Sequence, residues 1–184
     1  APHEISISPD EKRIYAGVIS SSGGDLNKGI KIFPPNRDGL GPEFTEGDSP
    51  KTLYTTAAAS TIEAGQTLTD LNLTVTNLTD GTSEKLTADG TQFALTNGTT
   101  GTTATNSMTY NVTVSSGTAT VTLSKVAGIS TAAMQTLVNA LAYENSSQDP
   151  TANSSRVVTL TVLKDNGSNT APNDNTTALS IAST

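Results

Sequence analysis

Cysteine and tryptophan are absent from the 184-residue chain, and histidine occurs once. The absence of cysteine excludes a thiolate nucleophile, a Cys/His dyad and a disulfide framework, and a single histidine cannot build a zinc cluster. His3 has no serine or carboxylate at a useful spacing, so it is no catalytic candidate. Any metal ion bound here is therefore expected to be a hard cation with oxygen ligands.

Basic residues are also scarce. The chain has 10 Lys and Arg against 17 Asp and Glu, a formal net charge of −7 and a pI near 4.5. Nucleic-acid binding needs clustered positive charge to neutralise phosphates, so a polynucleotide partner is not expected. No apolar run approaches the length of about 18 residues that a membrane span needs, so membrane insertion is not expected either.

Threonine and serine are abundant and their distribution along the chain is uneven. Together they supply about 29% of the residues, whereas aromatics supply 4%. Six of the ten basic residues and most of the prolines precede residue 55, after which Thr, Asn and Ser dominate. This change predicts two parts, residues 1–54 and residues 55–184.

The first part has the pattern of a small antiparallel β segment. Residues 4–8, 13–18 and 29–33 alternate with period two, and a Ser-Pro-Asp turn separates the first two. The stretches ISPDEKRIYAGV and GIKIF resemble the repeat of lactonase-type and surface-layer β-propellers. A single blade cannot bury its faces alone, so the whole chain is not expected to be a propeller.

The second part begins with short alternating strands. Residues 66–75 form one predicted strand, with a bend or bulge at Thr69-Asp70. Two further strands, at residues 84–86 and 92–95, flank the hairpin dipeptide Asp89-Gly90. Residues 97–103 lack large apolar side chains, and we expect them to form an exposed loop.

A hairpin, a helix and three strands follow. Residues 108–114 and 119–123 alternate around the turn Ser116-Gly117, and strands are also predicted within residues 140–143, 156–163 and 177–182. Ser130 is the expected N-cap of a helix that should close the open end of a sandwich. The apolar residues of that helix recur at helical spacing: Ala133, Met134, Leu137, Val138 and Leu141. Seven to nine short strands with one helix predict an all-β fold, an immunoglobulin/cadherin-like β-sandwich preceded by the small antiparallel β segment.

Residues 57–184 carry a second resemblance. GQTLTDLNLTVTNLTDGTSEKLTADGT, VAGISTAAMQTLVNALAYENSSQDPTANSSRVVTLTVLKDNGS and NDNTTALSIAST resemble the cadherin-like, immunoglobulin-like tandem repeats of very large bacterial surface proteins, including adhesins of the repeats-in-toxin type. The resemblance implies a secreted or cell-surface location and a role as spacer or ligand-binding unit. It also implies neighbouring modules of the same polypeptide as partners, often with calcium at the junctions.

Oxygen-rich loops are the candidate metal sites, because Ca²⁺ takes six to eight oxygen ligands. One set flanks the loop before the last strand, and the other follows the helix. The candidate ligands are Asp165, Asn166, Asp174 and Asn175 in the first set, and Glu144 and Asp149 in the second. The alternative is that these Asp and Asn residues only form turns, for which their side chains are well suited.

No spacing of acidic residues selects a catalytic pair, which favours a non-enzymatic module. Two alternatives stay open: a carbohydrate-binding β-sandwich, and a fragment of a propeller-containing surface enzyme. Carbohydrate stacking needs exposed aromatics, whereas most Tyr and Phe residues of this chain occupy the apolar side of predicted strands. The first alternative implies a cell-surface or carbohydrate ligand as partner, whereas core packing of the aromatics is the expected arrangement.

Overall fold

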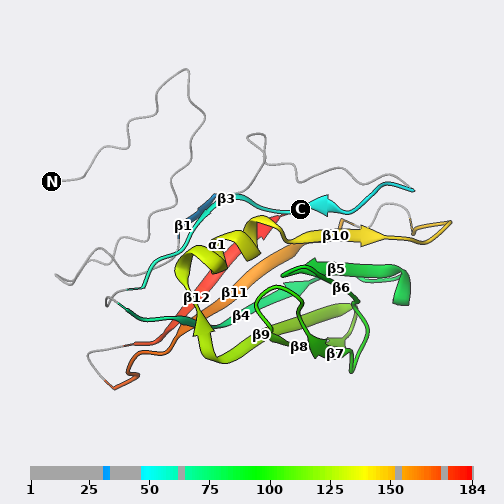
Figure 1. Cartoon of the computed structure of the whole chain (residues 1–184). Coiled ribbons are helices and arrows are strands. Elements are labelled where there is room, and N and C mark those ends of the chain that lie inside the picture. Colours follow the sequence, from blue (N-terminus) through cyan, green and yellow to red (C-terminus); the bar gives the residue numbers. More distant parts are fainter. Residues whose placement is uncertain (1–30, 34–46, 62–64, 152–154, 171–173, 184) are drawn as a thin grey trace, which may run out of the picture.

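The computed structural model describes residues 31–33, 47–61, 65–151, 155–170 and 174–183 (Figure 1). These residues form two packed antiparallel sheets and one α-helix, which confirms the all-β sandwich prediction. The strands predicted at residues 4–8 and 13–18 lie outside the described residues.

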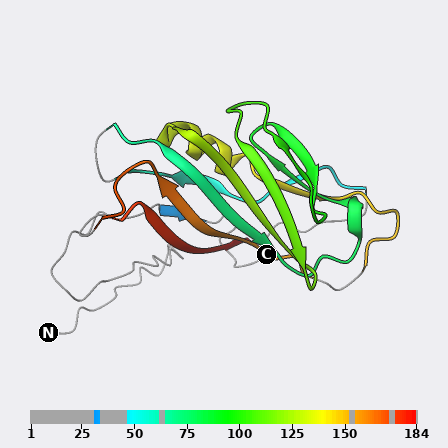
Figure 2. The ribbon, with the colours of Figure 1, turned by 90° about the horizontal axis from the view of Figure 1, so that it is seen from below.

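The larger sheet has six strands in the order β12-β11-β4-β9-β8-β7, and all neighbours are antiparallel. Figure 2 shows these strands side by side in one twisted layer, with β12 at its margin. The strands are β4 (Leu68–Val75), β7 (Thr100–Thr102), β8 (Thr109–Ser115), β9 (Thr118–Ile129), β11 (Val158–Asp165) and β12 (Thr176–Ser183). Apolar residues alternate with Thr, Ser and Asn along them, so one face packs on the core and the other faces solvent.

The smaller sheet has four strands in the order β2-β10-β5-β6. They are β2 (Lys51–Thr52), β5 (Glu84–Ala88), β6 (Thr91–Ala94) and β10 (Ala142–Asn145), and the short 3-10 helix η1 (Gly81–Ser83) precedes β5. A separate pair joins β1 (Lys31–Phe33) to β3 (Thr55–Ala58). Both β1 and β2 precede residue 55 yet pair with strands that follow it, and the boundary between residues 54 and 55 stays a prediction.

The helix α1 (Thr131–Asn139) connects the two sheets, running from the end of β9 to β10. As predicted, Ser130 caps it, because its Oγ accepts the Ala133 N–H at 3.1 Å. Met134, Leu137 and Val138 form its buried face. No helix of the described residues is long and apolar enough to span a bilayer.

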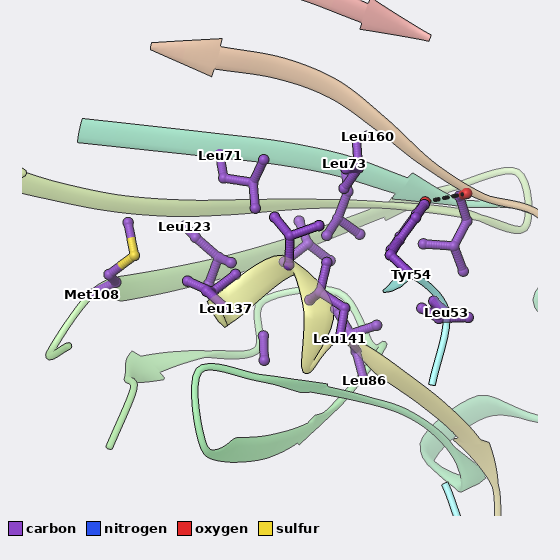
Figure 3. Packing of buried hydrophobic residues seen from close by; sticks show 14 of the residues in the cluster. Leu53, Tyr54, Leu71, Leu73, Leu86, Met108, Leu123, Leu137, Leu141 and Leu160 are labelled. Carbon is purple, nitrogen blue, oxygen red and sulfur yellow. Dashed lines mark hydrogen bonds between the residues drawn. The ribbon is translucent and has the colours of Figure 1, made fainter. Parts of the chain in front are cut away.

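The core lies between the sheets and receives side chains from both sheets and from the helix side (Figure 3). Leu73 and Leu160 come from the larger sheet, Leu86 from the smaller one, and Leu137 and Leu141 from α1 and the residues after it. All five are at most 2% exposed. The helix therefore fills the layer that the small sheet leaves open above the larger one.

Two hairpin turns have the backbone conformation that their sequences predict. Asp89 and Gly90 have φ of 49° and 78°, and Ser116 and Gly117 have φ of 48° and 72°. Two consecutive positive φ values match the right-handed twist of the flanking strands. The predicted irregularity at Thr69-Asp70 is also confirmed, because the pairing of β4 with β9 shifts register between Leu68 and Asp70.

The prediction of an exposed loop over residues 97–103 is wrong in part. Thr100–Thr102 form β7, the outermost strand beside β8. An edge strand pairs with only one neighbouring strand and can form without a large apolar residue. Threonine also favours the extended backbone of a strand. Gly101 leaves the space in which the Tyr110 ring lies, since a Cβ there would approach the ring atom Cζ to 2.7 Å.

Candidate functional site

Arg156, Asp80 and Glu84 form the main ionic cluster of the described residues, and we call these three side chains the Arg156 cluster. The Arg156 Nε donates to Glu84 Oε1 at 2.8 Å and Nη2 donates to Asp80 Oδ2 at 2.9 Å. Arg156 precedes β11 of the larger sheet, whereas Glu84 begins β5 of the smaller one. The ion pairs therefore join the two sheets.

Glu84 is fully buried and each of its carboxylate oxygens accepts two hydrogen bonds. Besides Arg156, Oε1 accepts the Tyr143 hydroxyl at 2.8 Å. Oε2 accepts the backbone N–H groups of Thr79 and Asp80, both at 2.8 Å. A buried carboxylate is costly unless it is paired and hydrogen-bonded, and these four donors meet that requirement.

Asp80 receives donors from three other segments of the chain. Its carboxylate accepts the Asn145 Nδ2 and the Thr151 Oγ1, each at 2.6 Å, in addition to Arg156. The Thr151 hydroxyl, followed by Asn145 and the Arg156 charge, holds the pKa of Asp80 below its usual value. The acid is thus kept ionised at neutral pH, as the Arg156 cluster requires.

Tyr143 remains a neutral donor to Glu84. Burial raises the pKa of the Tyr143 phenol by disfavouring the phenolate, and the hydrogen bond to the negative Glu84 raises it further. All four carboxylate oxygens of the Arg156 cluster therefore accept hydrogen bonds from the fold itself. The Arg156 cluster therefore links the two sheets through ion pairs and hydrogen bonds.

A second buried carboxylate, Asp89, links the same two sheets elsewhere. Asp89 is 3% exposed and accepts the Thr103 hydroxyl at 2.5 Å and the Asn106 backbone N–H at 2.9 Å. It lies in the β5–β6 turn, whereas Thr103 and Asn106 lie between β7 and β8. Lys125 of β9 donates to the Asn106 carbonyl at 2.5 Å and supplies a nearby positive charge.

The structure brings the two ends of the first predicted calcium set close together. The Asp165 N–H donates to the Asn175 carbonyl at 2.9 Å, so the two loop margins lie side by side. One side-chain oxygen of each of three candidates already accepts a backbone hydrogen bond: Asp165 from the Gly167 N–H, Asn166 from the Thr67 N–H and Asp174 from the Thr176 N–H. The loops therefore close by turn chemistry, and calcium binding at Asp165, Asn166, Asp174 and Asn175 stays a prediction.

The second predicted set makes separate contacts. Glu144 accepts the Gln92 Nε2 at 2.6 Å, and the Asp149 N–H donates to the Ser147 hydroxyl at 3.3 Å. Within the described part of the chain, no three His, Cys, Asp or Glu side chains gather closely enough to hold a metal ion. Calcium there would need backbone carbonyl or Asn oxygens to complete its shell.

The aromatic side chains that the structure describes pack inward. Tyr54, Phe93 and Tyr143 are buried, and Tyr110 stacks on Phe93 with ring centroids 4.2 Å apart and planes 8° apart. These four rings agree with the core packing expected from the sequence. The three buried rings have no exposed face for sugar stacking, and one face of the half-buried Tyr110 ring is covered by Phe93.

Sequence reasoning missed the Arg156 cluster, although a signal for part of it was present. Glu84 has the same two-residue phase as Leu86 and Ala88, so the strand pattern puts its carboxylate on the buried face. Arg156 is one of only four basic residues after residue 55, and it directly precedes an apolar strand. An acidic residue on the buried face of a strand and one of the few arginines together indicate a buried ion pair. They do not show which segments of the chain come together.

Tyr54 joins the segment that leads into the sandwich to the last strand. Its hydroxyl donates to the Val158 carbonyl at 2.7 Å and also lies 3.1 Å from the Ile181 carbonyl, so its one proton is shared between the two. Figure 3 shows Tyr54 and one bond from its hydroxyl. Burial raises the pKa of Tyr54, so the group stays a donor. The start of the sandwich and the end of β12 are therefore held at the same end of the molecule.

We expect Tyr54→Phe to lower the free energy of unfolding by about 1–2 kcal/mol, because the ring still fills its site while the hydrogen bonds are lost. Urea denaturation measures this change. Tyr110→Phe is the matched control, since it also removes one hydroxyl but keeps the stack on Phe93, and it should change the free energy by less than about 0.5 kcal/mol. Equal losses in both variants would contradict a specific role for Tyr54.

Comparison of the chain with protein-family models, with curated proteins and with solved structures gives no match. The class of protein is therefore defined by the fold of the described residues, which are mostly β: two open antiparallel sheets, of four and six strands, and one short helix.

Proposed function

We propose that the chain carries a non-enzymatic module of a large extracellular or cell-surface protein and acts there as an adhesion unit. The observation that carries the proposal is that the buried charged side chains bond to one another and to neighbouring polar groups across the two sheets. Asp80, Glu84, Arg156 and Asp89 are all engaged in bonds that join one sheet to the other. Such bonding suits a module that must keep its shape outside the cell. The resemblance to cadherin-like repeats supports the same role.

The path of the chain favours an adhesion unit over an in-line spacer. The chain passes from β2 of the smaller sheet to Tyr54, whose hydroxyl bonds to the carbonyls of Val158 and Ile181 near Ser183, where β12 ends. β12 has eight residues, so the loop before it lies roughly 25 Å from this end. In a polypeptide that continues on both sides, the module would project from the chain and present the Asp165–Asn175 side outward. A spacer in a straight stalk would instead enter and leave at opposite ends.

Retention of coated beads under flow tests the adhesion role. Beads that carry the chain through a tag after residue 184 are passed over cultured cells and over dextran-coated surfaces. We expect retention above that of albumin-blocked beads, and loss of retention when soluble chain is added as competitor. Absence of retention on every surface would favour the spacer role, whereas turnover of glycoside or ester substrates by the purified chain would contradict a non-enzymatic module.

Calcium is proposed as an additional stabiliser of the loops between β11 and β12. Because those loops are already closed by hydrogen bonds, we expect the chain to fold without calcium and to gain stability when it binds. Millimolar Ca²⁺ should raise the melting temperature and chelation should reverse the rise, with a gain of about 2.7 kcal/mol at a hundredfold excess over the dissociation constant. Asp165→Asn combined with Asp174→Asn should abolish the response, and an identical melting curve with Ca²⁺ and with chelator would remove the calcium proposal.

A further inference from the structure

Lys125, Asn106 and Asp89 bring an amine, a primary amide and a buried carboxylate together, and we call these three residues the Lys125 triad. Asp89 lies in the β5–β6 turn, Asn106 between β7 and β8, and Lys125 in β9. The Lys125 Nζ donates to the Asn106 backbone carbonyl at 2.5 Å, and the Asn106 Nδ2 donates to Asp89 Oδ1 at 2.5 Å. Asn106 is therefore held between an amine and a carboxylate.

Asp89 fixes the orientation of the Asn106 amide. The backbone N–H of Asn106 donates to Oδ2 of Asp89 at 2.9 Å, while its side-chain Nδ2 donates to Oδ1. Asp89 is itself held by the Thr103 hydroxyl and is 3% exposed. The Asn106 Nδ2, which is the leaving group in any substitution at Cγ, thus lies directly against a fixed carboxylate.

The backbone of β9 becomes irregular where Lys125 begins. Ser124 is the last residue of β9 in register with β4, and the next pair is at Ile129, so residues 125–128 bulge opposite a single residue of β4. Bulges redirect side chains and are frequent beside active sites. Lys125 is half-buried, and among the described residues its Nζ bonds to Asn106 and forms no ion pair. The amine is therefore directed at the asparagine rather than at a carboxylate.

Only a small movement separates the amine from the amide carbon. Cγ of Asn106 is three bonds from the backbone carbonyl carbon of the same residue, and the four-carbon lysine side chain is flexible. Rotation of Lys125 therefore brings Nζ to Cγ while Asp89 keeps Nδ2 in place. Two groups held in this way react as if at concentrations of roughly 10⁵–10⁸ M when they are well oriented.

We propose that Lys125 and Asn106 form an intramolecular amide cross-link, with Asp89 as the acid–base residue. Asp89 takes a proton from the Lys125 ammonium, and the neutral Nζ attacks Cγ of Asn106. The Nζ–Cγ bond forms and the Cγ–Nδ2 bond breaks. Asp89 carries two protons in turn from Nζ to Nδ2, so nitrogen leaves as ammonium and Asp89 is again a carboxylate. The reaction consumes no oxidant and no cofactor.

The cross-link would close the β8–β9 hairpin covalently, because residues 106 and 125 lie on either side of it. A covalent ring restricts the unfolded chain and so stabilises the fold.

Mass spectrometry of the full 184-residue chain tests the cross-link. We expect a mass lower than that of the sequence by one ammonia. Trypsin should fail to cleave after Lys125, because the amide removes the positive charge that trypsin recognises. Chymotrypsin then cuts after Tyr110, between the two linked residues, and the two pieces should stay joined.

Three variants assign the roles. Lys125→Arg removes the nucleophile but keeps the charge, and Asp89→Asn removes the acid–base group but keeps the shape, so both should have the full mass of their sequences. Lys85→Arg is the matched control, because Lys85 is another half-buried lysine but lies in β5, outside the Lys125 triad. It should lose ammonia as the original chain does. Melting curves verify that the variants are folded.

An original chain with the full mass of its sequence overturns the proposal, whatever the variants do. So does a loss of ammonia that persists in Lys125→Arg, because succinimide formation at an Asn-Gly pair such as Asn97-Gly98 also releases ammonia but needs no lysine. Separation of the two pieces after the cut at Tyr110 would overturn it as well. A cross-link that still forms in Asp89→Asn would overturn the acid–base role of Asp89.

Discussion

Arg156→Ala is expected to lower the free energy of unfolding by about 3–5 kcal/mol. The guanidinium is the positive partner of two nearly buried carboxylates, since the side chains of Asp80 and Glu84 are 8% and 0% exposed. Its removal leaves both negative charges in the interior without compensation, and this penalty is larger than the net contribution of the intact pairs. Urea denaturation monitored by circular dichroism measures the loss, because the midpoint should shift while the slope stays the same.

Lys164→Ala is the control for this experiment. Lys164 is a cation of β11 in the same sheet but is exposed, so its removal should change the free energy by less than about 0.5 kcal/mol. Arg156→Met tests whether lost packing contributes to the effect, because methionine restores apolar volume without the charge. A loss of less than 1 kcal/mol for both Arg156 variants would contradict the assigned role of the Arg156 cluster.

The strands and the helix could be predicted because their signals are local. The Asp89-Gly90 and Ser116-Gly117 turns, the Ser130 cap and the alternation along β8 and β9 each depend on residues close in sequence. The short strand β7 escaped prediction because its formation depends on the neighbour β8 rather than on its own apolar residues.

The polar clusters could be predicted much less well, because they join segments far apart in the sequence. Glu84 and Arg156 are separated by 72 residues, and Tyr54 and Ile181 by 127. Which of the acids meets the arginine is decided by how β5 and β11 approach each other in the sandwich, and no local spacing encodes that approach. By contrast, the proximity of Asp165 to Asn175 follows from the return of the chain between the consecutive strands β11 and β12.

Loss of the packing of α1 on the core should destabilise the fold about as much as loss of the Arg156 side chain. Leu137 is 2% exposed and belongs to the core cluster that both sheets share (Figure 3). We expect Leu137→Ala to lower the free energy of unfolding by about 2–5 kcal/mol, because the truncation loses apolar burial and leaves a cavity between rigid sheets. Alanine has a higher helix propensity than leucine, so the loss cannot come from the helix backbone.

Thr136→Ala separates the effect of core packing from the effect of helix propensity. Thr136 is the exposed neighbour of Leu137 in the same helix, and its hydroxyl only donates back to the Ala132 carbonyl at 3.1 Å. This variant should be neutral or slightly more stable, because alanine favours the helix and no core contact is lost. If Leu137→Ala costs no more than Thr136→Ala in urea denaturation, α1 does not close the sandwich. If Leu137→Ala costs the expected 2–5 kcal/mol, the helix stabilises the fold through its packing on the core. The smaller four-stranded sheet is then not sufficient by itself to cover the larger sheet.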